Sequence, residues 1–213
     1  RLFHPAKRVE LHFTIQKRRN FDPEALYVAF PFGPSDGRVI YETLGGIAAP
    51  ATDLLPGAAS DWQTMQSFAA VQWPAGQIVL TSDEIPLVQF GEINTGKFRR
   101  TMRVEKPHVF SWVMNNYWVT NFCASQEGEF SWHYDLTSHR PAKPSAATRF
   151  GWSVRVPLVA RVLPPAREAR GAPASSLFAE ALPTGLLLAG CRPTEDGLAL
   201  FLHVREVNGD ETS

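Results

Sequence analysis

The sequence predicts an all-β protein, an antiparallel β-sandwich that forms part of a domain and has at most one or two short helices. Hydrophobic and polar residues alternate with a period of two in several segments, which places one set of side chains on each face of a strand. The chain also has 17 prolines and 15 glycines among its 213 residues. These residues pre-set or permit the backbone angles of turns, so short strands joined by turns are favoured over an α/β sheet.

The clearest alternation covers residues 9–16 and residues 130–136. In the first segment the odd-numbered residues are apolar and the even-numbered ones polar, and in the second the even-numbered residues are apolar or aromatic. Roughly ten strands fit this template along the chain. Shorter apolar runs provide further strands at residues 27–32, 78–80, 86–90, 186–189 and 197–204.

Proline and glycine mark the connections between these strands. The stretch 141–145 predicts a polar loop, and residues 163–176 predict a longer loop excursion. Short helices are expected at residues 59–68 and 176–181. Strand-like segments resume after each loop, so we expect one β-sandwich segment that spans residues 1–213.

The charge balance excludes some classes of partner. Lys and Arg together number 21, as do Asp and Glu, so the formal net charge is zero. Such a chain has no net positive field to attract nucleic acid or an anionic membrane surface. No apolar run reaches the roughly 18 residues of a membrane span, and no signal-peptide pattern is visible, which leaves the cellular compartment unknown. A neutral or small polar partner is favoured.

Both ends of the sequence favour a segment of a longer polypeptide. The chain begins with Arg1 rather than methionine, and its last strand-like run is soon followed by the final residue, Ser213. A sheet that ends on a strand with no partner or closing element is rare. We therefore expect an excised fragment. Cys123 and Cys191 lack metal-knuckle or redox spacing and are expected to be free, buried thiols.

No complete catalytic or metal-binding motif is visible in the sequence. It lacks a GxSxG elbow, an HExxH pair, a phosphate-binding glycine loop and paired cysteines. Asp53 and Asp61 flank a turn-rich loop, and glycosidases use paired carboxylates. Acids beside Pro56 and Gly57 are, however, more often turn or cap residues. We therefore assign no catalytic residue and no metal ligand to this chain.

The densest polar and aromatic segment covers residues 110–122. It combines asparagine amides with rings that are able to pack on the apolar face of a sugar. The alternative is that tryptophan and phenylalanine on an alternating strand belong to the core and that the asparagines mark a turn or a buried hydrogen-bond network. The candidate sugar contacts are Asp61, Asn115, Asn116, Tyr117 and Trp118.

Four strings, in this order, resemble the β-rich C-terminal region of glycoside hydrolase family 38, the α-mannosidases. The resemblance spans most of residues 25–140, and residues 186–205 resemble later strands of the family. The residues before Leu26 and the region 172–182 lack a matching string. The strings are LYVAFPF at 26–32, DLLPGA at 53–58 followed by Asp61-Trp62 and Gln66, LTSDEIPLVQFG at 80–91, and NNYWVTNF at 115–122 followed by QEG at 126–128.

The resemblance implies an N-terminal catalytic domain with a divalent metal, zinc, and an aspartate nucleophile. A helical linker and β-sandwiches of the galactose-mutarotase-like type would follow. Only the sandwich part matches this chain, and no family metal ligand or nucleophile has a matching position here. We therefore expect a non-catalytic C-terminal portion without a cofactor of its own. Its partners would be the upstream catalytic domain of the same polypeptide and a mannose-containing carbohydrate, and its role to support and partly wall the active site.

Two other functions stay open. A stand-alone carbohydrate-binding module would hold a sugar directly through Asn116, Tyr117 and Trp118. An independent sugar-ring epimerase of the mutarotase type would need a histidine and an acid in one cleft. For that reaction the candidates are His133 with Glu127 or Asp135.

Overall fold

The structure is a computed structural model that describes residues 1–4, 6–117, 123–160, 162 and 182–209. The chain divides into two compact units, Arg1–Arg155 and Val156–Ser213. The expected excursion at 163–176 and the expected helix at 176–181 lie outside the described residues. A single sandwich segment over residues 1–213 stays a prediction.

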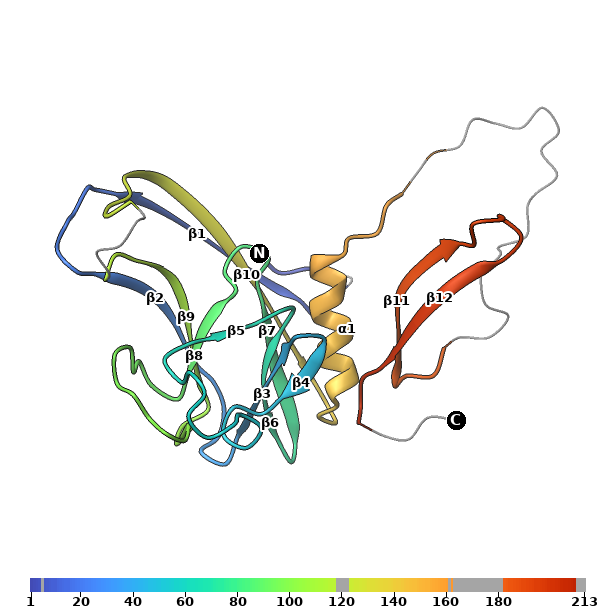
Figure 1. Ribbon diagram of the computed structural model, residues 1–213, viewed down its shortest axis with the longest axis horizontal. Helices are drawn as coiled ribbons and strands as arrows, with labels where there is room; N and C mark the ends of the chain where they lie inside the picture. Colours follow the sequence, from blue (N-terminus) through green and yellow to red (C-terminus); the bar gives the residue numbers. More distant parts are fainter. Residues whose placement is uncertain (5, 118–122, 161, 163–181, 210–213) are drawn as a thin grey trace. The chain divides into compact units, whose positions relative to one another are not determined.

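The strands of the first unit form two antiparallel sheets (Figure 1). One sheet has six strands in the order β1-β10-β7-β6-β3-β4, and the other has four in the order β2-β9-β8-β5. The predicted all-β, antiparallel, sandwich-like fold is therefore confirmed. The strands are β1 (Val9–Lys17), β2 (Ala25–Pro31), β3 (Arg38–Thr43), β4 (Gly46–Ala48), β5 (Gln63–Thr64), β6 (Ala69–Trp73), β7 (Gly76–Thr81), β8 (Leu87–Phe90), β9 (His108–Asn115) and β10 (Gly128–His139).

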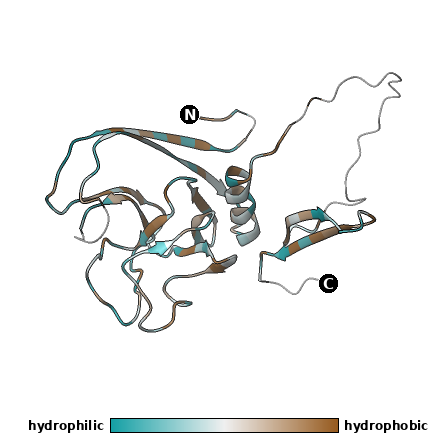
Figure 2. Ribbon diagram, turned by 45° about the horizontal axis from the view of Figure 1, so that its top comes forward, coloured by the Kyte–Doolittle hydropathy of each residue, from teal (hydrophilic) through white to brown (hydrophobic). Residues whose placement is uncertain are grey.

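The two segments with the clearest alternation are neighbours in the six-stranded sheet. β1 pairs with β10 in a register that places Val9 opposite Leu136 and Phe13 opposite Trp132. Opposite residues share a face of the sheet, and the rings of Phe13 and Trp132 stack with their centroids 5.5 Å apart. Figure 2 shows hydrophobic and hydrophilic residues following one another along these strands. The apolar face of this pair is turned toward the four-stranded sheet.

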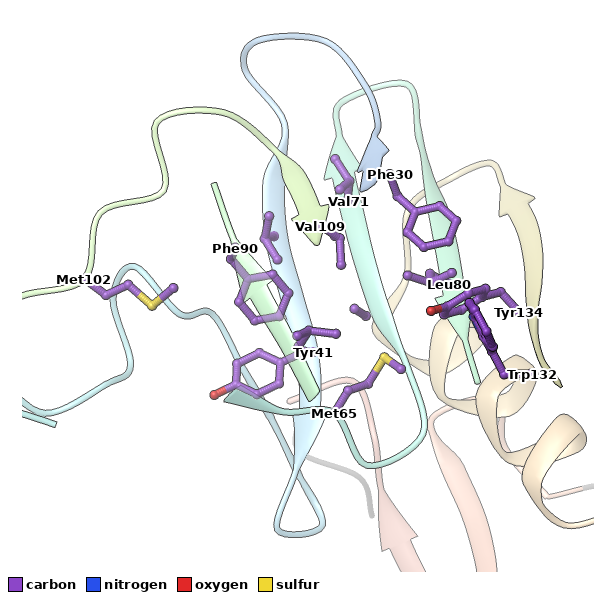
Figure 3. Packing of buried hydrophobic residues seen from close by; sticks show 13 residues of the cluster. Phe30, Tyr41, Met65, Val71, Leu80, Phe90, Met102, Val109, Trp132 and Tyr134 are labelled. Carbon is purple, nitrogen blue, oxygen red and sulfur yellow. The ribbon is translucent and has the colours of Figure 1, made fainter. Parts of the chain in front are cut away.

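The main hydrophobic core lies between the two sheets (Figure 3). Tyr41 and Tyr134 reach it from the six-stranded sheet, and Phe30 and Phe90 reach it from the four-stranded sheet. The Tyr134 hydroxyl donates a hydrogen bond of 2.8 Å to the Ser111 Oγ across this core. Burial raises the pKa of Tyr134 to about 12, so the hydroxyl keeps its proton at neutral pH.

One helix, α1 (Pro144–Arg155), covers the other face of the six-stranded sheet beside β7 and β10 (Figure 1). Ala147 of the helix packs in a second core cluster with Val79 of β7. At Gly151 an added Cβ would lie 2.6 Å from the Ser67 carbonyl oxygen. Glycine at this position therefore lets the helix approach the sheet closely.

One local prediction was wrong, and two others were right only in part. Residues 59–68 form no helix, since they contain the short strand β5 and irregular turns. Their apolar spacing arises because Met65 and Phe68 separately enter the two core clusters. The expected loop at 141–145 instead leads into α1 at Pro144, where the fixed φ of proline suits the first helical turn. Cys123 and Cys191 are free, as expected, but exposed rather than buried.

The described part of the second unit contains a hairpin of β11 (Leu186–Pro193) and β12 (Leu200–Glu206). The strands predicted at 186–189 and 197–204 are thus present, with a register shift between Leu188 and Gly190. Within the described segments, no helix is long and apolar enough to span a membrane.

Candidate functional site

A pocket of about 400 Å³ lies where β1 ends, β2 begins and β9 ends. This volume falls within the range of small-molecule sites in proteins. Apolar side chains from three strands are joined in the lining by amide, hydroxyl, thiol and charged groups. The lining residues are Ile15, Lys17, Glu24, Ala25, Leu26, Met114, Asn115, Asn116, Cys123, Ser125 and Gln126.

The side chain of Asn116 holds the rim of this pocket together. Its Oδ1 accepts a 2.7 Å hydrogen bond from the backbone N–H of Glu24. Its Nδ2 donates to the carbonyl oxygens of Asn20 at 3.1 Å, Asp22 at 3.0 Å and Ala124 at 3.2 Å. The amide thereby joins the turn before β2 to the segment after β9. The Oδ1 and Nδ2 of Asn116 could each bind a sugar hydroxyl, but here both form the hydrogen bonds that shape the pocket.

An ion pair lies in the pocket wall between Lys17 at the end of β1 and Glu24 just before β2. The Lys17 ammonium, together with the Asn20 amide that donates to Glu24 at 2.9 Å, lowers the pKa of the Glu24 carboxyl. The carboxylate is therefore ionised at neutral pH, and its charge is balanced by the lysine. A wall with one paired charge of each sign suits a neutral, polar ligand.

An aromatic cluster lies on the outer face of the four-stranded sheet, next to the segment that leads out of β9. Tyr27 and Trp112 stack with ring centroids 5.6 Å apart. Trp62 meets Trp112 edge to face at 5.5 Å, and Tyr117 lies 6.2 Å from the same indole. Trp112 is only 2% exposed, whereas Trp62 is 36% exposed. Trp62 therefore covers the buried Trp112 and presents part of its own ring to solvent.

Asp61 positions the loop that carries Trp62. Its carboxylate Oδ2 accepts a 2.8 Å hydrogen bond from the backbone N–H of Gly96, and its carbonyl oxygen accepts one from the Gln89 Nε2. Gln89 also donates to the Thr95 Oγ1 at 2.7 Å. These bonds tie the loop before β5 to the loop after β8, so the Asp61 carboxylate has a structural partner.

The structure describes four of the five predicted sugar contacts, and two of these four line the pocket. Asn115 and Asn116 line the pocket, while Tyr117 belongs to the aromatic cluster and Asp61 supports it. Trp118 lies outside the described residues. Lys17 and Glu24, among other pocket residues, were not predicted from the sequence. The residues next to them in the chain form no pattern that distinguishes two pocket residues from two exposed charged residues on either side of a turn.

Asp53, the other acid of the turn-rich loop, is a turn residue, which is the more common role of an acid in such a loop. Its carboxylate accepts hydrogen bonds of 2.7 Å from the Ala49 backbone N–H and from the Thr52 hydroxyl. The Ala49 N–H, followed by the Thr52 hydroxyl, lowers the pKa of the Asp53 carboxyl. Asp53 therefore fixes the turn after β4.

A cluster of charged and histidine side chains lies on the outer face of the six-stranded sheet. Glu10 and His12 of β1 stand directly opposite Asp135 and His133 of β10. The two imidazoles stack with centroids 5.7 Å apart. Arg8 reaches the Asp135 carboxylate with its Nε at 2.5 Å and an Nη at 2.9 Å. Because Asp135 is fully buried, this guanidinium neutralises its charge locally.

Of the two acids considered for an epimerase, Asp135 lies near His133, whereas Glu127 forms an ion pair with an arginine. The Nδ1 of His133 lies 2.7 Å from the Glu84 carboxylate, and its Nε2 lies 3.7 Å from Asp135. Glu127 is paired instead with Arg19 at 2.9 Å. Throughout the described part of the chain, no group of three or more His, Cys, Asp or Glu side chains is arranged to hold a metal ion.

Comparison with known proteins gives no assignment, since no protein-family model and no curated protein matches the chain. The resemblance to glycoside hydrolase family 38 therefore stays a prediction that rests on the four strings.

Proposed function

We propose that this chain is a non-catalytic β-sandwich portion of an α-mannosidase-type glycoside hydrolase. It supports and partly walls the active site of an upstream catalytic domain in the same polypeptide. The supporting observation is the position of the four family-like strings. Their described residues lie in β2, in the loop before β5, in the end of β7 with β8, and at the end of β9, while residues 118–122 of the fourth string lie outside the described residues. The described residues of these strings thus belong to β2, β8 and the end of β9 in the four-stranded sheet, and to the end of β7 in the six-stranded sheet.

The same strings contribute to both features described above. Leu26, Asn115 and Asn116 line the pocket, and Tyr27 and Trp62 belong to the aromatic cluster. Carbohydrate sites combine aromatic or apolar surface with a few polar groups that fix orientation. This combination supports mannose-containing carbohydrate as the ligand class of the complete site.

The supporting role is favoured because polar side chains near the pocket and the aromatic cluster form hydrogen bonds to the backbone of loops. The Asn116 amide and the Asp61 carboxylate both hold loops through backbone partners. A rigid frame of this kind positions a neighbouring reactive centre, since a reacting group must be held within a fraction of an ångström of its productive position. The zinc ion and the reactive carboxylates would belong to the catalytic domain, and no residue of this chain is assigned to them.

The alternative is a stand-alone carbohydrate-binding module. It is favoured by the pocket of about 400 Å³ and by the partly exposed ring of Trp62. Such a module would bind a sugar without any other domain.

Calorimetric titration of the 213-residue chain with mannose oligosaccharides tests the proposal against this alternative. The supporting role predicts no saturable binding, because most of the site belongs to the catalytic domain. Saturable binding that is lost in Trp118→Ala, with the circular dichroism spectrum unchanged, would establish the module instead. Phe98→Ala is the matched control, since Phe98 is an aromatic residue that is 81% exposed.

A further inference from the structure

The connection between β8 and β9 is a loop whose backbone is fixed at several points. The Gly91 N–H donates to the His108 carbonyl oxygen at 2.9 Å and closes the base of the loop. Met102 is 7% exposed and belongs to the main core (Figure 3). The Gly57 N–H donates to the Arg100 carbonyl oxygen at 2.6 Å. The loop therefore presents its exposed side chains from a defined backbone.

Cationic side chains of this loop surround two adjoining hollows of about 200 and 640 Å³. The hollows share four lining residues and form one continuous depression, here called the basic hollow. Arg100, Arg103 and Lys106 are exposed at its edge. The charged residues of the basic hollow are Glu92, Arg99, Arg100, Arg103, Glu105 and Lys106.

The charges in the basic hollow are unbalanced. Arg99 forms an ion pair with Glu92. Over the ranges that the structure describes, no carboxylate forms an ion pair with Arg100, Arg103 or Lys106. Four cations thus face two carboxylates, a local excess of two positive charges. The chain as a whole has a formal charge of zero, so this excess is a local feature.

We propose that the basic hollow binds a dianionic phosphate group. A guanidinium presents a planar fork of donors that matches two oxygens of a phosphate, and such charge-assisted hydrogen bonds are stronger than neutral ones. The two charges of the phosphate match the local excess. The larger hollow, at about 640 Å³, also leaves room for a group that carries the phosphate, such as a sugar ring. This site does not depend on the function proposed above.

Isothermal titration at low ionic strength tests this site on the complete chain. The probes are inorganic phosphate, glucose 6-phosphate and, as the neutral control, glucose. The double variant Arg100→Gln/Arg103→Gln removes two exposed guanidiniums, and exposed side chains of this kind have little effect on folding. The matched control is Arg149→Gln, which removes an exposed guanidinium from α1.

Saturable phosphate binding is expected in the wild-type chain and in Arg149→Gln. Each lost guanidinium is expected to weaken it by about tenfold, so the double variant binds about 100-fold more weakly. Tighter binding of glucose 6-phosphate than of inorganic phosphate, without binding of glucose, identifies a phosphate ester as the ligand. Equal binding shows that the phosphate group alone is recognised, and tighter binding of inorganic phosphate identifies free phosphate. Absence of saturable binding in the wild type, or equal weakening in Arg149→Gln, would overturn the proposal.

Discussion

Asp135 is fully buried on β10, and its charge is matched by the Arg8 guanidinium at 2.5 and 2.9 Å. Removal of one partner from a buried ion pair leaves an uncompensated charge, which costs more than the pair itself contributes. Arg8 precedes β1, so this contact also fixes the start of that strand on β10.

Arg8→Ala is expected to lower the free energy of unfolding by about 3 kcal/mol, because the buried Asp135 carboxylate loses its counter-charge. Urea unfolding followed by tryptophan fluorescence measures the change. Arg19→Ala is the matched control, since both side chains of the Arg19–Glu127 pair are more than half exposed. Exposed pairs contribute little, so equal losses in the two variants would contradict this account.

Glu10 contributes to the pH dependence of stability. The hydrogen bond from His12 lowers the pKa of the Glu10 carboxyl below its ordinary value of 4.5, and burial only partly opposes this. Because the pKa is lower in the folded state than in the unfolded state, the stabilisation is present above about pH 4.5. It is lost as the pH falls through the folded-state pKa.

Urea midpoints of the wild type and Glu10→Gln, measured from pH 7 to pH 3, test this linkage. The wild type is expected to be more stable at pH 7, and the difference is expected to shrink below pH 4.5 as the carboxylate is protonated. A difference that stays constant over the whole range would show that ionisation of Glu10 makes no contribution.

The candidate site could be predicted from the sequence only where polar and aromatic residues are neighbours in the chain. The segment 110–122 pointed to Asn115 and Asn116, which do line the pocket. Lys17 and Glu24 could not be found in this way, since they become pocket residues only when β1 and β2 are placed beside β9. The amide of Asn116 is used for loop contacts, which agrees with the alternative that the asparagines mark a turn.

At the scale of the elements, α1 could not be predicted because it buries small residues. Ala147 and Gly151 face the six-stranded sheet, where large apolar side chains would not fit. A helix that is held by close backbone approach lacks the strong apolar stripe that sequence patterns detect. β1 and β10 were predictable because each has polar residues on one face and large apolar residues on the other.

Gly151→Ala tests the close approach of α1. In an exposed helix this change stabilises by about 1 kcal/mol. Here the new methyl group would lie 2.6 Å from the Ser67 carbonyl oxygen, so we expect a loss of about 1–3 kcal/mol. Thermal unfolding measures it, with Ser153→Ala on the exposed side of the same helix as control. An increase in Tm for Gly151→Ala would contradict the packing described for α1.

For the whole molecule, the fold class was predictable because alternation and turn residues are local signals. The partition into Arg1–Arg155 and Val156–Ser213 was not, since strand-like segments occur in both units. The proposed role as the supporting part of a larger enzyme is also a property of the whole molecule. It depends on the four strings, whose described residues include parts of β2, β8 and β9 in one sheet, and on polar groups that hold loops.

The most direct test of that role is an assay of the 213-residue chain with an aryl α-mannoside in the presence of zinc. The account predicts no hydrolysis above the buffer rate, because the chain provides a frame and the reactive groups belong to the catalytic domain. Hydrolysis by the purified chain at an appreciable rate, abolished in a variant of one of its own carboxylates, would contradict it.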